Sequence, residues 1–140
     1  MTLNLESVNW LAVGTAAIAT FFLGGIWYTA LAKPWQRLHG YTDEQVVEMK
    51  KLRPPPVFFG GMIASYLLLA AVLGVLFASV GIASLTAGLT MGLLLWLGVA
   101  LPIGITAWIA SNKPFAAFAI DFAYQLVFLL LTGAILGAWR

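Results

Sequence analysis

Four long apolar runs constrain this chain more than any other feature of its sequence. They cover about residues 10–31, 57–80, 85–111 and 115–139. Each run has the roughly 20 apolar residues that an α-helix needs to cross a bilayer. Only 9% of the residues are charged, whereas a soluble domain has about 25%. The sequence therefore predicts an all-α, polytopic membrane protein, a four-transmembrane-helix bundle in which residues 1–140 form a single membrane domain.

Charge is distributed unequally among the segments that connect these runs, and this predicts an orientation. Residues 32–56 contain five Lys or Arg residues and Lys113 precedes the last run, whereas residues 81–84 and the N-terminal tail contain none. Short loops rich in Lys and Arg stay in the cytoplasm, so both termini are expected outside it. The first run is too long for a secretory signal and has no basic start, so we expect a retained helix.

The connector between the first two spans carries the signals of a short amphipathic cytoplasmic helix. Thr42 and Gln45 have the spacing of a capping box. A helix over Asp43–Leu52 would begin with acidic residues and end with Lys50 and Lys51, an arrangement that complements the helix dipole. The connector is interpreted either as a docking surface for a partner or anionic lipid, or as a solvated segment that fixes the topology.

The residues that flank this short helix are expected to leave regular helical structure. Residues 34–40 are predicted to form one interfacial turn with Trp35 and Leu38 facing lipid. His39 is interpreted as a surface residue rather than a ligand. The three prolines at 54–56 are predicted to block the helix and force an extended entry into the second span.

Asp121 is the only acidic or basic side chain inside any of the four apolar runs. A charged residue at the centre of a membrane helix costs about 2.5–3.5 kcal/mol on insertion scales, so it marks a functional or a bundle-organising position. Asp121 lies seven residues after Pro114, or about 10 Å along a helix. At that depth several polar residues of other runs are expected nearby. The predicted polar intramembrane cluster comprises Asp121, Tyr124, Gln125, Ser65, Tyr66 and Tyr28.

Two interpretations of Asp121 follow from this cluster. In the first, the desolvated carboxylate binds a proton or a cation and couples it to transport. In the second, Asp121 is hydrogen-bonded to its neighbours and fixes the register of the helices. A position near the membrane boundary lets water approach the carboxylate, which favours the structural interpretation.

Small residues at a four-residue spacing predict where the helices approach one another closely. Gly88 and Gly92 have this spacing in the third run, and Gly133 and Gly137 have it in the fourth. Helices in lipid associate through such positions because their backbones can meet there. Pro102 is expected to bend the third helix and free a backbone carbonyl.

The sequence offers little material for catalysis or for a cofactor. It contains no cysteine and one histidine, so thiolate metal sites and cysteine nucleophiles are excluded. The apolar runs contain no paired carboxylates and no phosphate-binding glycine loop. No enzyme activity, no cofactor and no metal site are expected. No basic stripe predicts nucleic-acid binding, and the many aromatic side chains leave only a weaker alternative, a bound quinone or pigment.

The order of several short motifs resembles a known family. Residues 9–13 read Asn-Trp-Leu-Ala-Val, residues 24–28 read Gly-Gly-Ile-Trp-Tyr, and Lys-Pro-Trp follows at 33–35. Residues 120–127 read Ile-Asp-Phe-Ala-Tyr-Gln-Leu-Val, and residues 133–139 read Gly-Ala-Ile-Leu-Gly-Ala-Trp. This order is similar to that of an uncharacterised family of small bacterial inner-membrane proteins, domain of unknown function 1761.

The resemblance covers nearly the whole chain and implies a four-helix protein of the bacterial inner (plasma) membrane without an assigned activity. The family usually has a glycine where this chain has Ala123, which makes close packing there less certain. The shared pattern includes Trp10, Trp27, Tyr28, Asp121, Tyr124, Gly133 and Gly137.

Two functions remain after these exclusions. The first is a non-enzymatic accessory or structural membrane protein, either a homo-oligomer or a subunit of a larger complex. The alternative is a small oligomeric proton- or cation-coupled transporter that uses Asp121 as its coupling site. A change of Asp121 to asparagine separates them, because a residue that only fixes register tolerates its isostere whereas a coupling carboxylate does not.

Overall fold

The computed structural model describes residues 1–139, which form helices and short connections without any strand. Four helices are long and apolar enough to cross a membrane: α1 (Trp10–Ala30), α4 (Pro55–Val80), a continuous helix over Leu85–Ser111, and α7 (Phe115–Ala138). The prediction of an all-α fold with four long apolar helices is therefore confirmed.

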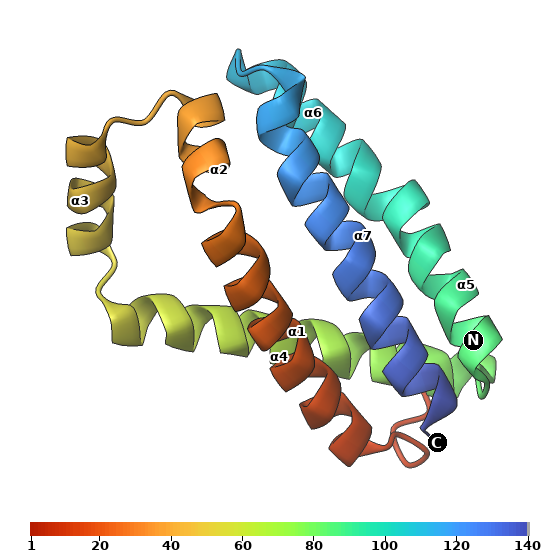
Figure 1. The fold of residues 1–140 in the computed structure, drawn as a ribbon. Helices are drawn as coiled ribbons and strands as arrows, with labels where there is room; N and C mark the ends of the chain where they lie inside the picture. Colours follow the sequence, from red (N-terminus) through yellow and green to blue (C-terminus); the bar gives the residue numbers. More distant parts are fainter. Residues whose placement is uncertain (140) are drawn as a thin grey trace.

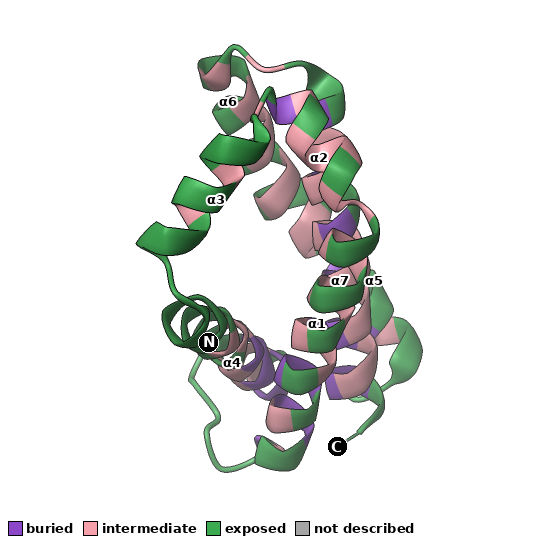
Figure 2. Ribbon diagram, turned by 60° about the vertical axis from the view of Figure 1, so that its left-hand side comes forward, coloured by how far each residue is buried: buried purple, intermediate pink, exposed green. Residues whose placement is uncertain are grey.

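Helix α7 lies between α1 and the helix over residues 85–111, and these three run side by side (Figure 1). Helix α4 crosses α1 steeply instead of running along it (Figure 1). All the buried residues of α4 lie in its second half. Figure 2 shows the buried residues concentrated where α1, α4 and α7 meet. The buried residues of α4 are Ala70, Leu73, Gly74, Phe77 and Ala78.

The third span changes its helical geometry halfway. It consists of α5 (Leu85–Leu95), one π-helical turn η1 (Trp96–Ala100) and α6 (Leu101–Ser111). The N–H of Leu101 donates to the carbonyl of Trp96, five residues earlier. Pro102 follows directly and lacks the N–H that would bond to the carbonyl four residues before it. The wider turn is how the helix accommodates the expected disturbance at Pro102.

Glycines bring α5 and α7 into backbone contact. A Cβ atom on Gly88 would overlap the carbonyl oxygen of Gly133, and one on Gly133 would overlap the carbonyl oxygen of Gly88. A Cβ atom on Gly92 would lie 2.5 Å from the carbonyl oxygen of Leu129. Gly137 also meets backbone atoms of α5. All four glycines with the four-residue spacing thus lie along this one interface, which we call the glycine seam.

The connector between α1 and α4 forms two helices, α2 (Ala32–His39) and α3 (Asp43–Leu52). The Thr42–Gln45 capping box is present, with both of its hydrogen bonds. The expected extended entry over three prolines is wrong in part. Only Pro54 is extended, whereas Pro55 and Pro56 form the first turn of α4, where the missing N–H groups have no helical partner to lose.

The N-terminal tail and the end of α7 lie at the same end of the molecule (Figure 1). Asn9 caps α1 by accepting a hydrogen bond from the N–H of Ala12, and its Nδ2 donates to the carbonyl of Trp139 at 3.4 Å. The N–H of Asn4 donates to Ser79 near the end of α4. The helix ends around the N-terminal tail are therefore tied together at one level.

Candidate functional site: polar contacts around α7

The carboxylate of Asp121 joins α7 to α1. The phenol of Tyr28 donates a hydrogen bond to its Oδ1 at 2.5 Å. Both side chains are partly buried. Tyr28 lies near the end of α1, and Asp121 lies two turns into α7, so their contact aligns these two helices at one depth. Both residues belong to the polar intramembrane cluster predicted from the sequence.

Tyr124 connects α7 to both α1 and α4. Its hydroxyl lies 2.7 Å from the hydroxyl of Tyr66 in α4, and it donates to the carbonyl oxygen of Thr20 in α1 at 3.1 Å. Gly24 makes room for this contact, because a Cβ atom at that position would lie 2.7 Å from the Tyr124 hydroxyl. The ring of Tyr28 packs edge-on against the ring of Tyr124. The phenols of Tyr66 and Tyr124 thus meet where Gly24 leaves space beside α1.

Two indoles approach the α7 backbone on either side of Asp121. The Nε1 of Trp27 in α1 donates to the carbonyl of Ile120 at 3.2 Å. The Nε1 of Trp96, the first residue of the π-helical turn, donates to the carbonyl of Phe122 at 2.9 Å. Each indole buries its apolar body between helices while its N–H finds an acceptor. Asp121 is thus flanked by hydrogen bonds from both neighbouring helices.

A further contact between α1 and α7 lies deeper. The hydroxyls of Thr20 and Thr132 are 3.3 Å apart, and each residue is only 1% exposed. Thr20 and Trp96 are absent from the cluster predicted from sequence. Thr20 has a weak signal, because Thr20, Gly24 and Tyr28 follow one another at a four-residue spacing on one face of α1. Trp96 has none, since its direction depends on the π-helical turn.

Two residues of the predicted cluster do not join it. Ser65 is exposed, and its hydroxyl donates to the carbonyl of Gly61 in its own helix at 2.9 Å. It precedes Tyr66 by one residue, or about 100° around α4, and this offset turns it away from α7. Gln125 lies one turn after Asp121, but its Oε1 is buried and accepts no hydrogen bond within the described residues.

The interpretation of His39 as a surface residue is wrong. Its side chain is 8% exposed and packs against Trp35, Tyr41 and Phe118, with ring centroids 4.2, 5.6 and 5.8 Å away. The short helix α2 docks against the start of α7, and this contact covers the imidazole. The Nζ of Lys113 donates to the carbonyl of His39 at 2.6 Å. The segment predicted to form one interfacial turn is thus a short helix, α2, that packs against the start of α7.

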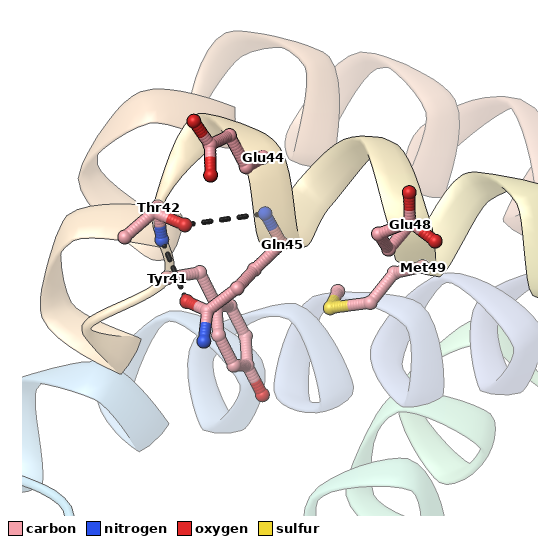
Figure 3. Close-up of a pocket in the computed structure, with 6 residues that line it drawn as sticks. All are labelled: Tyr41, Thr42, Glu44, Gln45, Glu48 and Met49. Carbon is pink, nitrogen blue, oxygen red and sulfur yellow. Dashed lines mark hydrogen bonds between the residues drawn. The ribbon is translucent and has the colours of Figure 1, made fainter.

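The hollow drawn in Figure 3 lies beside α3, and Asp121 is not among the residues that line it. Its volume is about 590 Å³. Figure 3 shows Thr42 and Gln45 in their reciprocal capping contact, with Glu44 and Glu48 along the same helix. Within residues 1–139, no group of three or more His, Asp or Glu side chains is placed to hold a metal ion. The hollow is lined by Tyr41, Thr42, Glu44, Gln45, Glu48 and Met49.

The arrangement around α7 is suited to holding helices together. A hydroxyl or an indole N–H from each neighbouring helix bonds to α7, and the carboxylate accepts one of these donors. Hydrogen bonds of this kind between membrane helices contribute about 0.6 kcal/mol on average. Several of them at one depth fix the register of the helices more than any single one does.

Comparison with known proteins gives one match. The family model described as "Protein of unknown function (DUF1761)" matches residues 11–137. No curated protein and no solved structure matches this chain. The matched region covers all four long apolar helices except Trp10 and Ala138, and it contains every residue of the polar contacts around α7.

Proposed function

This chain belongs to the DUF1761 family, whose function is unknown, and we propose that it is a non-enzymatic accessory or structural membrane protein. It acts as a homo-oligomer or as a subunit of a larger membrane complex. In this role the protein contributes a fixed surface to its partners, and the polar residues inside its spans serve to hold that surface in shape.

The hydrogen bonding of Asp121 is the observation that carries this proposal. Its Oδ1 accepts the phenol of Tyr28, and the neighbouring carbonyls of Ile120 and Phe122 accept indole N–H groups. An acidic residue inside a membrane helix is usually paired or faces a wet cavity. Here the pairing partner is present and comes from another helix of the same chain, as expected of a residue that sets helix register.

The distribution of charge supports a location in the bacterial inner membrane with both termini outside the cytoplasm. The connector after α1 and the turn before α7 carry the basic residues, and short basic loops are retained on the cytoplasmic side. Cysteines introduced at Ser7 and at Glu48, in an otherwise cysteine-free chain, test this orientation by labelling of intact cells. Labelling of Glu48→Cys but not Ser7→Cys by an impermeant thiol reagent would overturn it.

Purification from its native membrane in mild detergent tests the accessory function. We expect a defined partner, or a second copy of the chain, at constant stoichiometry, and we expect Asp121→Asn to retain it. The asparagine can still accept the Tyr28 hydrogen bond, so the surface presented to a partner keeps its shape. A chain that purifies alone and as a monomer would contradict the proposal.

One observation favours the alternative, a proton- or cation-coupled transporter that uses Asp121. The Oε1 of Gln125, one helical turn from the carboxylate, is buried and has no donor among residues 1–139. A proton on Asp121 or a bound cation would supply the missing partner. Reconstituted into vesicles, such a transporter would release or take up protons with its substrate, and Asp121→Asn would abolish this coupling. Equal coupling in the variant and the wild type would exclude the alternative.

A further inference from the structure

Helix α2 lies at the boundary of the apolar spans. Only Leu31 separates it from α1, and its far end packs against the first turns of α7 (Figure 1). The residues at this level therefore stand where a spanning helix leaves the hydrocarbon and meets the lipid headgroups. This placement holds for either orientation of the chain in the membrane.

Contacts with α7 and with the turn before it hold α2 in this position. The ammonium group of Lys113 donates to the carbonyl at the end of α2 and lies 5.4 Å from the centre of the Tyr41 ring. His39 is enclosed between Trp35 and Phe118. A helix held in this way presents its remaining side chains in fixed directions.

Three basic residues lie on α2 and in the turn before α7. Lys33 and Arg37 are exposed on α2, and Lys113 follows α6. Residues 31–42 and 101–120 contain no Asp or Glu. Trp35 is two residues from both Lys33 and Arg37 in sequence and therefore about 200° around α2 from each of them. Its Nε1 is buried and donates to no atom within the described chain.

We propose that α2 and the turn between α6 and α7 bind the phosphate group of an anionic phospholipid. Lys33, Arg37 and Lys113 supply the charge. Basic residues beside a span attract anionic lipids, with roughly fivefold in affinity for each Lys or Arg near the surface. The lipid would fix α2 against the membrane surface, in addition to the contacts that α2 makes with α7 and with Lys113.

The other basic segment of the connector lacks these properties. Helix α3 and the residue after it carry Lys50, Lys51 and Arg53, but α3 also carries three acidic residues. One of the lysines is engaged, since Nζ of Lys51 lies 3.2 Å from Glu48. Positive and negative charges therefore balance along α3, and the same number of basic residues gives no net attraction for a phosphate.

This difference provides a matched pair of variants for a lipid-binding test. The full chain is titrated in detergent with phosphatidylglycerol, and bound lipid is counted by native mass spectrometry, with phosphatidylcholine as the neutral lipid. We expect the double variant Lys33→Gln/Arg37→Gln to bind phosphatidylglycerol about 30-fold more weakly than wild type, the product of roughly fivefold for each charge. The control Lys50→Gln/Lys51→Gln removes the same charge from α3 and is expected to change binding less than about threefold.

Further measurements separate a bound lipid from other causes. Trp35→Phe keeps every charge and changes only a buried N–H group, so it is expected to bind phosphatidylglycerol as the wild type does. Inorganic phosphate is expected not to compete. Equal weakening by the α2 and α3 double variants would overturn the proposal, as would equal binding of phosphatidylcholine or full competition by inorganic phosphate. Circular dichroism and elution volume establish that each variant is folded. Arg37→Gln alone, expected to weaken binding about fivefold, remains informative if the double variant is not folded.

Discussion

Helix α7 is held by two neighbours in two different ways. Against α5 it uses glycines, so that backbone meets backbone along Gly88 and Gly133. Against α1 it uses side chains, with hydrogen bonds from Tyr28 to Asp121 and between Thr20 and Thr132. One interface has no room for a side chain, and the other depends on specific polar ones.

The difference shows how a small membrane protein fixes helices without a hydrophobic driving force. Lipid is as apolar as a leucine side chain, so association depends on close packing and on hydrogen bonds between helices. The glycine seam depends on close packing, and the α1–α7 interface depends on hydrogen bonds. The glycine seam is therefore expected to be intolerant of added volume, whereas the α1–α7 interface is expected to be sensitive to loss of polar groups.

The largest effect is expected in the glycine seam. Gly88→Ala places a methyl group on the carbonyl of Gly133, and two backbones must separate to admit it. We expect a loss of about 3 kcal/mol in unfolding free energy or a failure to fold. The matched control is Gly98→Ala in the same span, which has no neighbour within 4 Å of the added atom. Similar losses for both variants, measured by denaturation in mixed micelles, would remove the distinction between them.

A smaller effect is expected where a buried donor loses its acceptor. Asp121→Leu leaves the Tyr28 phenol unpaired, and we expect a loss of about 2 kcal/mol in unfolding free energy. Asp121→Asn keeps an acceptor oxygen and is expected to lose less than about 1 kcal/mol. Both variants are compared with wild type by denaturation in mixed micelles. If asparagine destabilised the protein as much as leucine does, the hydrogen bond would not be the cause.

Adjacent glycines in α1 provide the next comparison. Gly24→Ala brings a methyl group to 2.7 Å from the Tyr124 hydroxyl, so the contact between Tyr124 and Tyr66 must shift. We expect a loss of about 1 kcal/mol in unfolding free energy. Gly25→Ala adds the same atom one residue later, where nothing lies within 4 Å, and is expected to be neutral or slightly stabilising. We therefore expect a lower melting temperature in detergent for Gly24→Ala than for Gly25→Ala, and the reverse order would contradict this comparison.

The smallest effect is expected at the deeper contact between α1 and α7. Thr20→Val removes one hydroxyl from a 3.3 Å contact and keeps the side-chain shape. We expect a loss of about 0.6 kcal/mol in unfolding free energy, the average for hydrogen bonds between membrane helices. Thr90→Val in α5 is the control, because its hydroxyl bonds only to a carbonyl of its own helix. An unchanged denaturation midpoint for Thr20→Val would mean that this contact does not contribute.

The fold was largely predictable because hydropathy and length decide whether a helix can cross a membrane. The cluster was predictable in part, since depth along a helix follows from its rise per residue and placed Tyr28, Asp121 and Tyr124 together. The placement of Ser65 in the cluster was wrong because the depth of a residue does not determine the direction in which α4 presents its side chain. Trp96 was missed because a π-helical turn redirects it, and His39 because docking of α2 on α7 is a tertiary contact.

A double-mutant cycle between Tyr28 and Asp121 tests most directly the central claim that the carboxylate serves to hold α1 against α7. Unfolding free energies are measured for Tyr28→Phe, Asp121→Leu and the combined variant. We expect Tyr28→Phe to destabilise the wild type by about 1 kcal/mol and to have almost no effect once Asp121 is leucine, because the bond is already lost. Strictly additive losses in the combined variant would contradict the claim.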